Sequence, residues 1–183
     1  IWKDVPGILN ADPRYFENAQ LLNKISYREA IELAFYGASV IHPKTLQPLQ
    51  RKEIPLYVKS FLHPEKDGSL INQNAESDAA VPSYIHKEGQ VLVSISSKDY
   101  AFMDEVKLAK IFSLFSDYGL TINIMQNSAI SFSVAFDYRK GKVEELMTVL
   151  ENEFLVSYNL NAILNANNSN ISKKVDFYLL KHW

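Results

Sequence analysis

The chain has 183 residues, 47% of them hydrophobic, and a net charge of −2 at neutral pH. The sequence has no long basic run, so its charge gives no indication of binding to nucleic acid or to an anionic membrane. The absence of cysteine excludes disulfides and thiolate metal sites. No apolar stretch approaches the roughly twenty residues of a membrane span, and no signal peptide opens the chain. We therefore expect a cytoplasmic protein without nucleic-acid or membrane partners.

The first fourteen residues, IWKDVPGILNADPR, combine a strand end with two polar turns. Ile1 and Trp2 are typical of the end of a buried strand, and the DVPG run that follows is turn chemistry. Asp12 and Arg14 place a carboxylate and a guanidinium at the next bend. Loops after strand ends are where α/β proteins bind ligands, and arginine binds phosphate bidentately. The run predicts half of a ligand site, whose other half would lie upstream.

Residues up to about 71 predict an α/β unit. Ser26 and Glu29 form a capping-box pattern that begins a helix, and Gly37 marks its end. His42, which precedes a proline, could serve as a catalytic base, but a lone histidine there is more often a structural hydrogen-bonding residue. The further elements expected in this unit are a buried strand at Ala38–Ile41, a helix from Thr45 through Gln50 and an alternating strand at Ile54–Ser60.

A second unit is predicted after a polar stretch at residues 72–88, which suits a linker between domains. The expected strands are 90–96, 120–125, 130–136 and 155–158, and the expected helices are 104–118 and 142–154. This βαββαβ order is the ferredoxin-like pattern. Acidic residues on the helices, such as Glu144 and Glu145, are interpreted as solvated. The tail divides into an asparagine-rich extended loop at Asn159–Asn170 and a strand-like run at Val175–Trp183.

The first unit resembles the C-terminal part of the aspartokinase catalytic domain. The resemblance rests on the opening run, on the GA-x-V-IHP element at Gly37–Pro43 and on the IPLYVKS strand, in that order. Aspartokinases are ATP-dependent kinases of the amino-acid kinase (carbamate kinase-like) fold that phosphorylate the side-chain carboxylate of aspartate. The second unit, in which a helix leads into a hairpin beginning at a glycine, resembles an ACT domain, the amino-acid-sensing module that follows the kinase domain in that family.

This resemblance implies an α/β and α+β chain with four parts. Residues 1–71 would be the C-terminal part of the kinase domain on its ATP side, 72–88 a linker, 89–159 an ACT domain, and 160–183 a loop and strand. That last strand would either begin a second ACT domain or pair back onto the first. The implied full enzyme converts L-aspartate and ATP, with Mg²⁺, to 4-phospho-L-aspartate for lysine, threonine and methionine biosynthesis. It would be a homodimer through its ACT domains.

In aspartokinases the loop after the IW pair holds the adenine and ribose of ATP, and the arginine of the DPR element approaches the phosphates. The resemblance assigns Asp4 to nucleoside recognition and Arg14 to phosphate neutralisation. The alternative is that Asp4 caps a turn and Arg14 pairs with a neighbouring carboxylate. Three further positions of this ATP site depart from the usual pattern: Lys3 replaces a common threonine, Leu9 an aromatic residue, and Ser39 a lysine that contacts the nucleotide.

The ACT resemblance implies an amino-acid effector bound between the first helix of that domain and its hairpin, usually across a dimer. The candidate effector-binding residues are Leu108, Asn123, Gln126, Asn127 and Ser128. The alternative is that the polar ones only terminate a strand and build the turn. Asn123 and Ala129 replace an aspartate and a glutamate found in lysine-sensing relatives. The expected effector is lysine or threonine, and the lost negative charge favours threonine, or no effector, over lysine.

The family's catalytic centre lies upstream of the resembling region, where the lysine of a Lys-Phe-Gly-Gly element stabilises the transferring phosphoryl group. No glycine-rich loop occurs among the six glycines of this chain, and phosphoryl transfer depends on positioning and charge neutralisation. We therefore predict no catalytic residue, no metal site and no kinase activity in this chain alone. Two alternatives stay open: a stand-alone amino-acid-binding ACT module, and a piece of another amino-acid kinase whose appended domain serves only oligomerisation.

Overall fold

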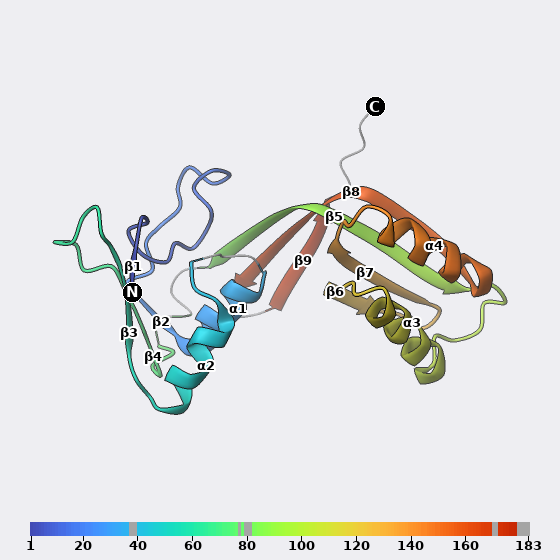
Figure 1. Cartoon of the computed structure of the whole chain (residues 1–183), viewed down its shortest axis with the longest axis horizontal. Coiled ribbons are helices and arrows are strands. Elements are labelled where there is room, and N and C mark those ends of the chain that lie inside the picture. The colour runs from blue at the N-terminus through green and yellow to red at the C-terminus, as the bar shows by residue number, and fades with distance from the viewer. Residues whose placement is uncertain (37–39, 77, 79–81, 170–171, 179–183) are drawn as a thin grey trace. The chain divides into compact units, whose positions relative to one another are not determined.

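The structure, a computed structural model, describes residues 1–36, 40–76, 78, 82–169 and 172–178. The chain divides into two compact units, the first built mainly on residues 1–87 and the second mainly on residues 88–164 (Figure 1). Within the described ranges, no helix is both long and apolar enough to cross a membrane.

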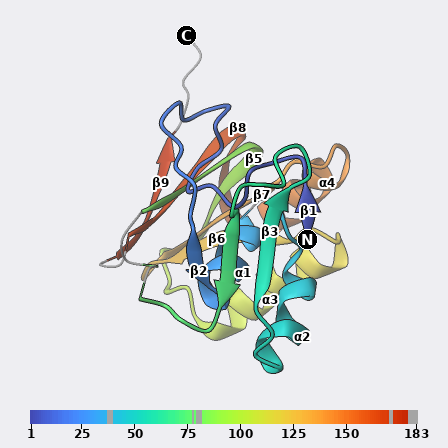
Figure 2. The same ribbon diagram turned by 90° about the vertical axis from the view of Figure 1, so that its left-hand side faces the viewer.

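The first unit contains a four-stranded sheet and two helices. Its elements are β1 (Trp2–Lys3), β2 (Lys24–Ser26), α1 (Tyr27–Tyr36), α2 (Pro43–Arg51), β3 (Leu56–Ser60) and β4 (Ser69–Asn72). The strands lie side by side in the order β1-β3-β4-β2 (Figure 2). β1 runs parallel to β3 and β2 parallel to β4, whereas β3 and β4 pair antiparallel.

Two expectations about strands in this unit are wrong. Val40 and Ile41 lie in a turn and a bend, and the rest of that predicted strand, together with Gly37, lies outside the described residues. Ile1 and Trp2 were expected to end a buried strand, but Trp2 begins β1. Trp2 is 57% exposed and Ile1 is 43% exposed, so the strand is not buried. The reason is its position at the edge of the sheet, next to β3.

The helix α2 begins two residues before the predicted start. Proline at the first helical position needs no hydrogen-bond partner for its nitrogen, which makes Pro43 a suitable first residue. His42 caps this helix, because its Nδ1 accepts a hydrogen bond from the Lys44 N–H at 3.1 Å. The structural role favoured for His42 is confirmed.

The helix α1 begins with half of the expected capping box. The Ser26 Oγ accepts a hydrogen bond from the Glu29 N–H at 3.1 Å. The Ser26 N–H itself donates to the carboxylate of Asp78 at 2.8 Å. In a standard capping box, the glutamate side chain accepts the hydrogen bond from this N–H group. Here Asp78 accepts it instead, and the contact holds Asp78 at the start of the helix.

Replacing Ser26 with alanine is expected to lower the free energy of unfolding by about 0.5–2 kcal/mol, the usual cost of losing a side-chain cap. Ser26 is only 3% exposed, so water cannot readily take over the hydrogen bond from Glu29. Urea denaturation followed by circular dichroism measures the loss. The matched control is Ser113→Ala, at an exposed helical serine, which should change stability by less than about 0.5 kcal/mol. An equally small effect at Ser26 would contradict its capping role.

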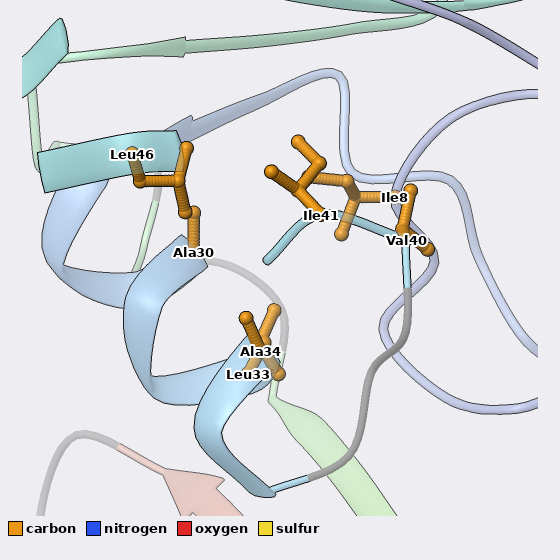
Figure 3. A pocket seen from close by; sticks show the side chains of 7 residues that line it. All are labelled: Ile8, Ala30, Leu33, Ala34, Val40, Ile41 and Leu46. Atoms are coloured by element: carbon orange, nitrogen blue, oxygen red, sulfur yellow. The ribbon is translucent and has the colours of Figure 1, made fainter. Parts of the chain in front are cut away.

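The core of the first unit lies between its helices and its sheet. Its buried side chains include Ile25, Leu33, Leu46, Val58 and Ile71. Figure 3 shows a small pocket beside this core, of about 10 Å³, lined by Ile8, Ala30, Leu33, Ala34, Val40, Ile41 and Leu46. These aliphatic side chains offer no hydrogen-bond partner to a water molecule. The pocket is therefore a packing defect and not a ligand site.

The remaining elements follow the predicted βαββαβ order and end in an added strand. They are β5 (Ser83–Ser97), α3 (Glu105–Asp117), β6 (Ile122–Asn127), β7 (Ser131–Asp137), α4 (Lys142–Glu153), β8 (Phe154–Ser169) and β9 (Ser172–Tyr178). The strand order is β6-β7-β5-β8-β9. The arrangement of β5 to β8 confirms the ferredoxin-like pattern.

The extent of two strands differs from the sequence expectation. β5 begins at Ser83, inside the stretch expected to be a linker, and β8 continues to Ser169 through the asparagine-rich run that was expected to be a loop. β9 is the neighbour of β8 in the same sheet, and its last residues, 175–178, begin the run that was expected to be strand-like. The assignment of domains to residue ranges stays a prediction.

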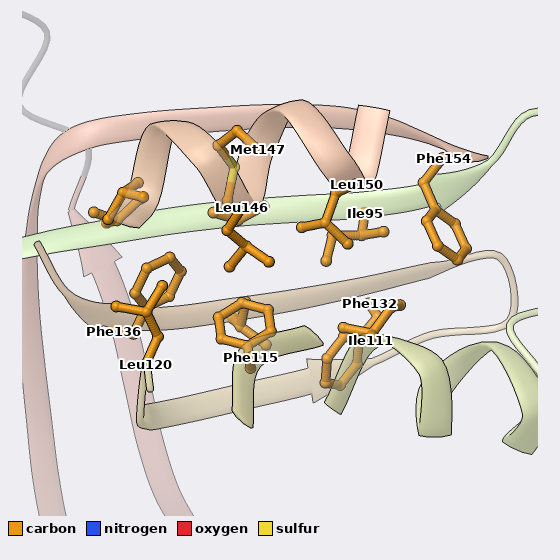
Figure 4. Packing of buried hydrophobic residues seen from close by; sticks show 14 of the residues in the cluster. Ile95, Ile111, Phe115, Leu120, Phe132, Phe136, Leu146, Met147, Leu150 and Phe154 are labelled. Atoms are coloured by element: carbon orange, nitrogen blue, oxygen red, sulfur yellow. The ribbon is translucent and has the colours of Figure 1, made fainter. Parts of the chain in front are cut away.

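The core of the second unit lies between the two helices and one face of the sheet. Alternate residues of β5, namely Val91, Val93 and Ile95, are fully buried on that face. They pack with Phe115 of α3 and Leu146 of α4 in one cluster. Figure 4 shows the side chains of this cluster pointing toward one another from the helices and the strands. Apolar and polar residues alternate along these strands in the sequence because only one face of the sheet is buried.

Glu144 is more than the solvated residue that the sequence suggested. Its carboxylate accepts hydrogen bonds from the Gly141 N–H at 2.6 Å and from the Tyr138 hydroxyl at 2.7 Å. The Tyr138 hydrogen bond is the main cause that holds the pKa of Glu144 below its ordinary value. Glu144 therefore fixes the first turn of α4 to the end of β7.

Candidate functional site

The candidate ATP-binding residues lie in and after β1. Lys3 is half-buried in β1, and Asp4 follows it directly and is exposed. Leu9 is half-buried and forms an antiparallel bridge with Leu21, which closes the segment between them into an arm. Ser39 lies outside the described residues.

The turn before this arm is held tightly against β4. The Ile8 N–H donates a hydrogen bond to the Ser69 Oγ at 2.8 Å. A Cβ added to Gly7 would lie 2.5 Å from the same Oγ and 2.8 Å from the Leu21 Cδ1. Only glycine permits this close approach, so the arm starts from a fixed point on the sheet.

Asn10 joins the two ends of the arm and attaches it to the start of β5. Its backbone N–H donates to the Gln20 carbonyl at 2.9 Å, and its Oδ1 accepts from the Gln20 N–H at 2.6 Å. Its Nδ2 donates to the Pro82 carbonyl at 3.0 Å, and its own carbonyl accepts from the Tyr84 N–H at 2.7 Å. Asn10 is 7% exposed, so all four polar groups of a buried residue are satisfied.

Arg14 pairs with Asp12 at the tip of the arm. The Arg14 Nε lies 3.1 Å from both carboxylate oxygens, and its Nη2 lies 2.6 Å from Oδ2. The Arg14 guanidinium carbon also lies 5.7 Å from the centroid of the Tyr15 ring. The Arg14 side chain is 79% exposed. This ion pair is the one that the alternative interpretation of Arg14 expects, and it leaves the guanidinium in contact with solvent.

Replacing Arg14 with glutamine is expected to raise the pKa of Asp12. The side-chain hydrogen bond from Arg14 is the largest cause that lowers this pKa from its ordinary value. A lowered carboxyl pKa stabilises the folded state above the unfolded-state pKa, and this contribution is lost as the pH falls through the folded-state pKa. Because the pair is exposed, we expect a change in the titration with little change in stability.

An NMR titration of the Asp12 carboxyl carbon measures this effect. The matched control is Arg51→Gln, at an exposed arginine at the end of α2, which should leave the titration of Asp12 unchanged. An unchanged Asp12 midpoint in the Arg14 variant would contradict the ion pair.

The candidate effector residue Asn123 lies in a β-bulge. Ile122 pairs with Phe136 and Ile124 pairs with Ala135, so Asn123 is the extra residue of β6. Its Nδ2 donates to the Gln90 Oε1 at 2.7 Å and to the Asp137 Oδ1 at 3.0 Å.

This bulge completes a polar network. The Gln90 Nε2 also donates to the Asp137 Oδ1 at 2.7 Å, and Gln90 is 1% exposed. Asn123 therefore closes a network around a buried glutamine, and its amide nitrogen already has two acceptors.

The other effector candidates lie elsewhere on the unit. Gln126 and Asn127 are exposed at the far end of β6, and Leu108 is half-buried against the core. The Ser128 Oγ is 2.7 Å from the Ser131 Oγ, within the turn that joins β6 to β7. Asn123 and Ser128 are five positions apart, which in a strand is roughly 16 Å. The structure therefore divides the candidates between two places, and the Ser128 contacts are those of a turn.

Sequence reasoning missed three polar residues of these sites: Asn10, Gln90 and Asp137. A sequence signal existed for Gln90 and Asp137, because each is a polar residue at an end of one of the strands predicted around 90–96 and 130–136. In the structure the two residues pair directly in the antiparallel register. For Asn10 no signal existed, because its partners Pro82 and Tyr84 are distant in the sequence.

Two surface hollows contain none of the predicted site residues. One, of about 460 Å³, lies at the start of α1 and includes Arg28 and Glu32 in its lining. The other, of about 290 Å³, lies beside β5 and β8 and includes Ser96 and Ser157. In the part of the chain that the structure describes, no three His, Asp or Glu side chains gather in a way that could hold a metal ion.

Comparison with known proteins shows the relationships of the chain. Residues 1–60 match the amino acid kinase family. The bifunctional aspartokinase/homoserine dehydrogenase of Haemophilus influenzae is 34% identical over 155 residues, which are 84% of this chain and 19% of that protein.

Two solved structures are also similar to it. E. coli aspartokinase III has a TM-score of 0.75 at 27% identity, and the match covers 91% of this chain and 38% of that one. Clostridium acetobutylicum aspartate kinase has a TM-score of 0.80 at 28% identity, covering 92% and 40%. The chain thus spans less than half the length of each of these three proteins, and the similarity confirms the expected fold class.

Proposed function

Because this chain belongs to the aspartokinase family, we propose that it forms the ATP-side and regulatory part of an aspartate kinase. That enzyme transfers the γ-phosphoryl group of ATP to the side-chain carboxylate of L-aspartate, and the 4-phospho-L-aspartate formed serves the synthesis of lysine, threonine and methionine. The observation that carries the proposal is the segment after β1, which lies inside the region matching the amino acid kinase family. It places Asp4 in the turn that follows β1 and Arg14 on the arm. E. coli aspartokinase III has been solved with aspartate and ADP, which supports these substrates.

Asp4 and Arg14 have the chemistry that a nucleotide needs. An exposed carboxylate directly after a strand can accept hydrogen bonds from ribose hydroxyls, and a permanent cation can neutralise the phosphates. Asp12 holds the Arg14 guanidinium by a bidentate contact, which fixes the orientation of the guanidinium before ligand arrives. The phosphates would bring Mg²⁺ with them, as is usual for ATP. Lys3, Leu9 and Ser39 would complete the surroundings of the nucleotide.

The chain alone should not carry out the reaction. Phosphoryl transfer needs groups that position both substrates and neutralise charge, and the sequence has no glycine-rich loop to cradle phosphates. Large apolar side chains are exposed at β1, β3 and the segment after β3: Trp2, Tyr57, Phe61 and Leu62 are 52–62% exposed. Such a patch supports contact with further protein in the working enzyme.

The ferredoxin-like unit would supply regulation and assembly. β6 is an edge strand of its sheet, and an unpaired strand edge is a template for pairing with another chain, which supports a homodimer through this unit. E. coli aspartokinase III has been solved with lysine, and an amino-acid effector is proposed here too. Lysine or threonine would bind at one of the two places between which the candidate residues are divided, either beside Asn123 or beside Leu108, Gln126, Asn127 and Ser128.

Calorimetric titration with ATP tests the nucleotide site. Arg14→Gln should weaken ATP binding by about tenfold or more, because a charged hydrogen bond to phosphate contributes about 1.5–3 kcal/mol. Arg51→Gln removes the same charge elsewhere and should bind ATP like the wild type. Equal affinities in both variants, or no ATP binding by the wild type, would refute the proposed site.

Two further measurements address activity and regulation. ADP release from aspartate and ATP by this chain alone would refute the expected inactivity. Thermal-shift measurements with lysine, threonine and methionine test the effector site, and an unchanged melting temperature with all three would refute amino-acid sensing by this chain.

A further inference from the structure

We infer that Asn10 is a positioning residue that fixes the arm carrying Arg14 against the first residues of β5 and thereby sets the affinity for the nucleotide. This inference rests on the proposed function of the arm. It assigns a role to a buried residue whose partners lie on two separate stretches of the chain.

The first observation is how Asn10 closes the arm at its base. Two hydrogen bonds join Asn10 to Gln20, one through its backbone and one through its side chain. Just outside them, the Leu22 N–H donates to the Ile8 carbonyl at 2.9 Å. The residues between Asn10 and Gln20 therefore form a loop whose ends cannot separate, and Arg14 stands near the middle of that loop.

The second observation is how the closed arm attaches to β5. The Asn10 amide and carbonyl bind the backbone of Pro82 and Tyr84. Farther along the arm, the Tyr15 and His86 rings are in contact, with centroids 4.1 Å apart and planes tilted by 38°, and the centroids of the Phe16 and Tyr84 rings lie 5.7 Å apart. The attachment thus has a buried polar part at Asn10 and an aromatic part next to Arg14.

These contacts matter for binding because Arg14 lies on the arm that they hold in place. Its own side chain is mostly exposed, and its bidentate partner Asp12 belongs to the same arm. The Tyr15 and Phe16 N–H groups both donate to the Asp12 carbonyl at 3.0 Å, so the tip is one compact turn. A shift of the arm would carry Arg14, Asp12 and Tyr15 away together. A cation displaced from its ligand loses affinity even when its own contacts are intact.

The test uses the whole chain with three variants. Asn10→Ala removes both side-chain hydrogen bonds. Asn10→Asp keeps the acceptor for the Gln20 N–H and loses the donor to Pro82. Asn18→Ala is the matched control, at an exposed asparagine of the same arm. For each protein we would measure ATP affinity by calorimetry and the NMR shift of the His86 ring protons, which reports its contact with Tyr15. His86→Gln assigns that signal.

Asn10→Ala should move the His86 signal away from its wild-type position and weaken ATP binding by about tenfold or more. Asn10→Asp should change both at least as much, because its carboxylate would face the Pro82 carbonyl in a buried place. Asn18→Ala should change neither. The inference is overturned if the alanine variant melts earlier yet keeps both the His86 shift and the ATP affinity, since Asn10 would then serve stability only. Should the alanine variant not fold, the aspartate variant decides by the same two measurements. If the wild type binds no ATP, the proposed function fails, and the His86 shift still decides whether Asn10 positions the arm.

Discussion

Replacing Phe136 with alanine is expected to lower the free energy of unfolding of the second unit by about 3–5 kcal/mol, the usual cost of deleting a buried phenylalanine. Phe136 is fully buried on β7, and its ring meets Phe115 of α3 edge to face, with centroids 5.0 Å apart. The sheet and both helices surround this position (Figure 4). Because the interior is close-packed, the neighbours cannot collapse into the space left behind. Urea denaturation followed by near-ultraviolet circular dichroism measures the loss.

The control for this change is another phenylalanine of the same unit. Phe102 is 73% exposed, and Phe102→Ala should alter stability by less than about 0.5 kcal/mol. A double-mutant cycle with Phe115→Ala should give a coupling of about 0.5–1.5 kcal/mol for the aromatic pair. If Phe136→Ala costs no more than Phe102→Ala, the placement of β7 over α3 is wrong.

The ferredoxin-like unit could be predicted from the sequence because its signals are local. The helix α3 begins after Asp104, whose carboxylate caps the Lys107 N–H, and it ends at Gly119, whose φ is +62°. Glycine takes this left-handed conformation without a steric cost. The strands β5 and β7 bury alternate residues, which appears in the sequence as a period of two. Each of these signals lies within or next to the element that it predicts.

Other elements could not be predicted, because distant partners determine them. β2 and β4 are three and four residues long, too short to show a period, and they form because Lys24 to Ser26 pair with Leu70 to Asn72. The asparagine-rich end of β8 has a low intrinsic preference for strands. It is a strand because β8 lies between β5 and β9 in the sheet, where neighbours on both sides satisfy its backbone.

The candidate sites divide in the same way. Asp4 and Arg14 could be named from a run of fourteen residues, because a motif is local in sequence. The residues that hold those motifs in place could not be named. Asn10 binds Pro82, which is 72 positions away. A buried amide has no recognisable spacing to its partner, so only the three-dimensional arrangement identifies it.

Replacing Gly68 with alanine is expected to destabilise the first unit by more than about 2 kcal/mol, because two costs add there. The φ angle of Gly68 is +74°, a left-handed conformation that costs any other residue about 1–2 kcal/mol. In addition, an added Cβ would overlap the Val58 carbonyl oxygen. That oxygen belongs to the backbone of β3, and Val58 is paired with Ser69. Relief of the overlap would therefore disturb the β3–β4 pairing at the centre of the four-stranded sheet.

Gly89→Ala separates these two costs. The φ angle of Gly89 is +66°, close to that of Gly68, yet a Cβ there would have no neighbour within 4 Å. This variant should lose only the conformational cost of about 1–2 kcal/mol. Differential scanning calorimetry would follow the transition of each unit in turn. Equal losses at the two glycines would mean that the β3–β4 hairpin yields to an added methyl group, and that close packing at Val58 does not require glycine at residue 68.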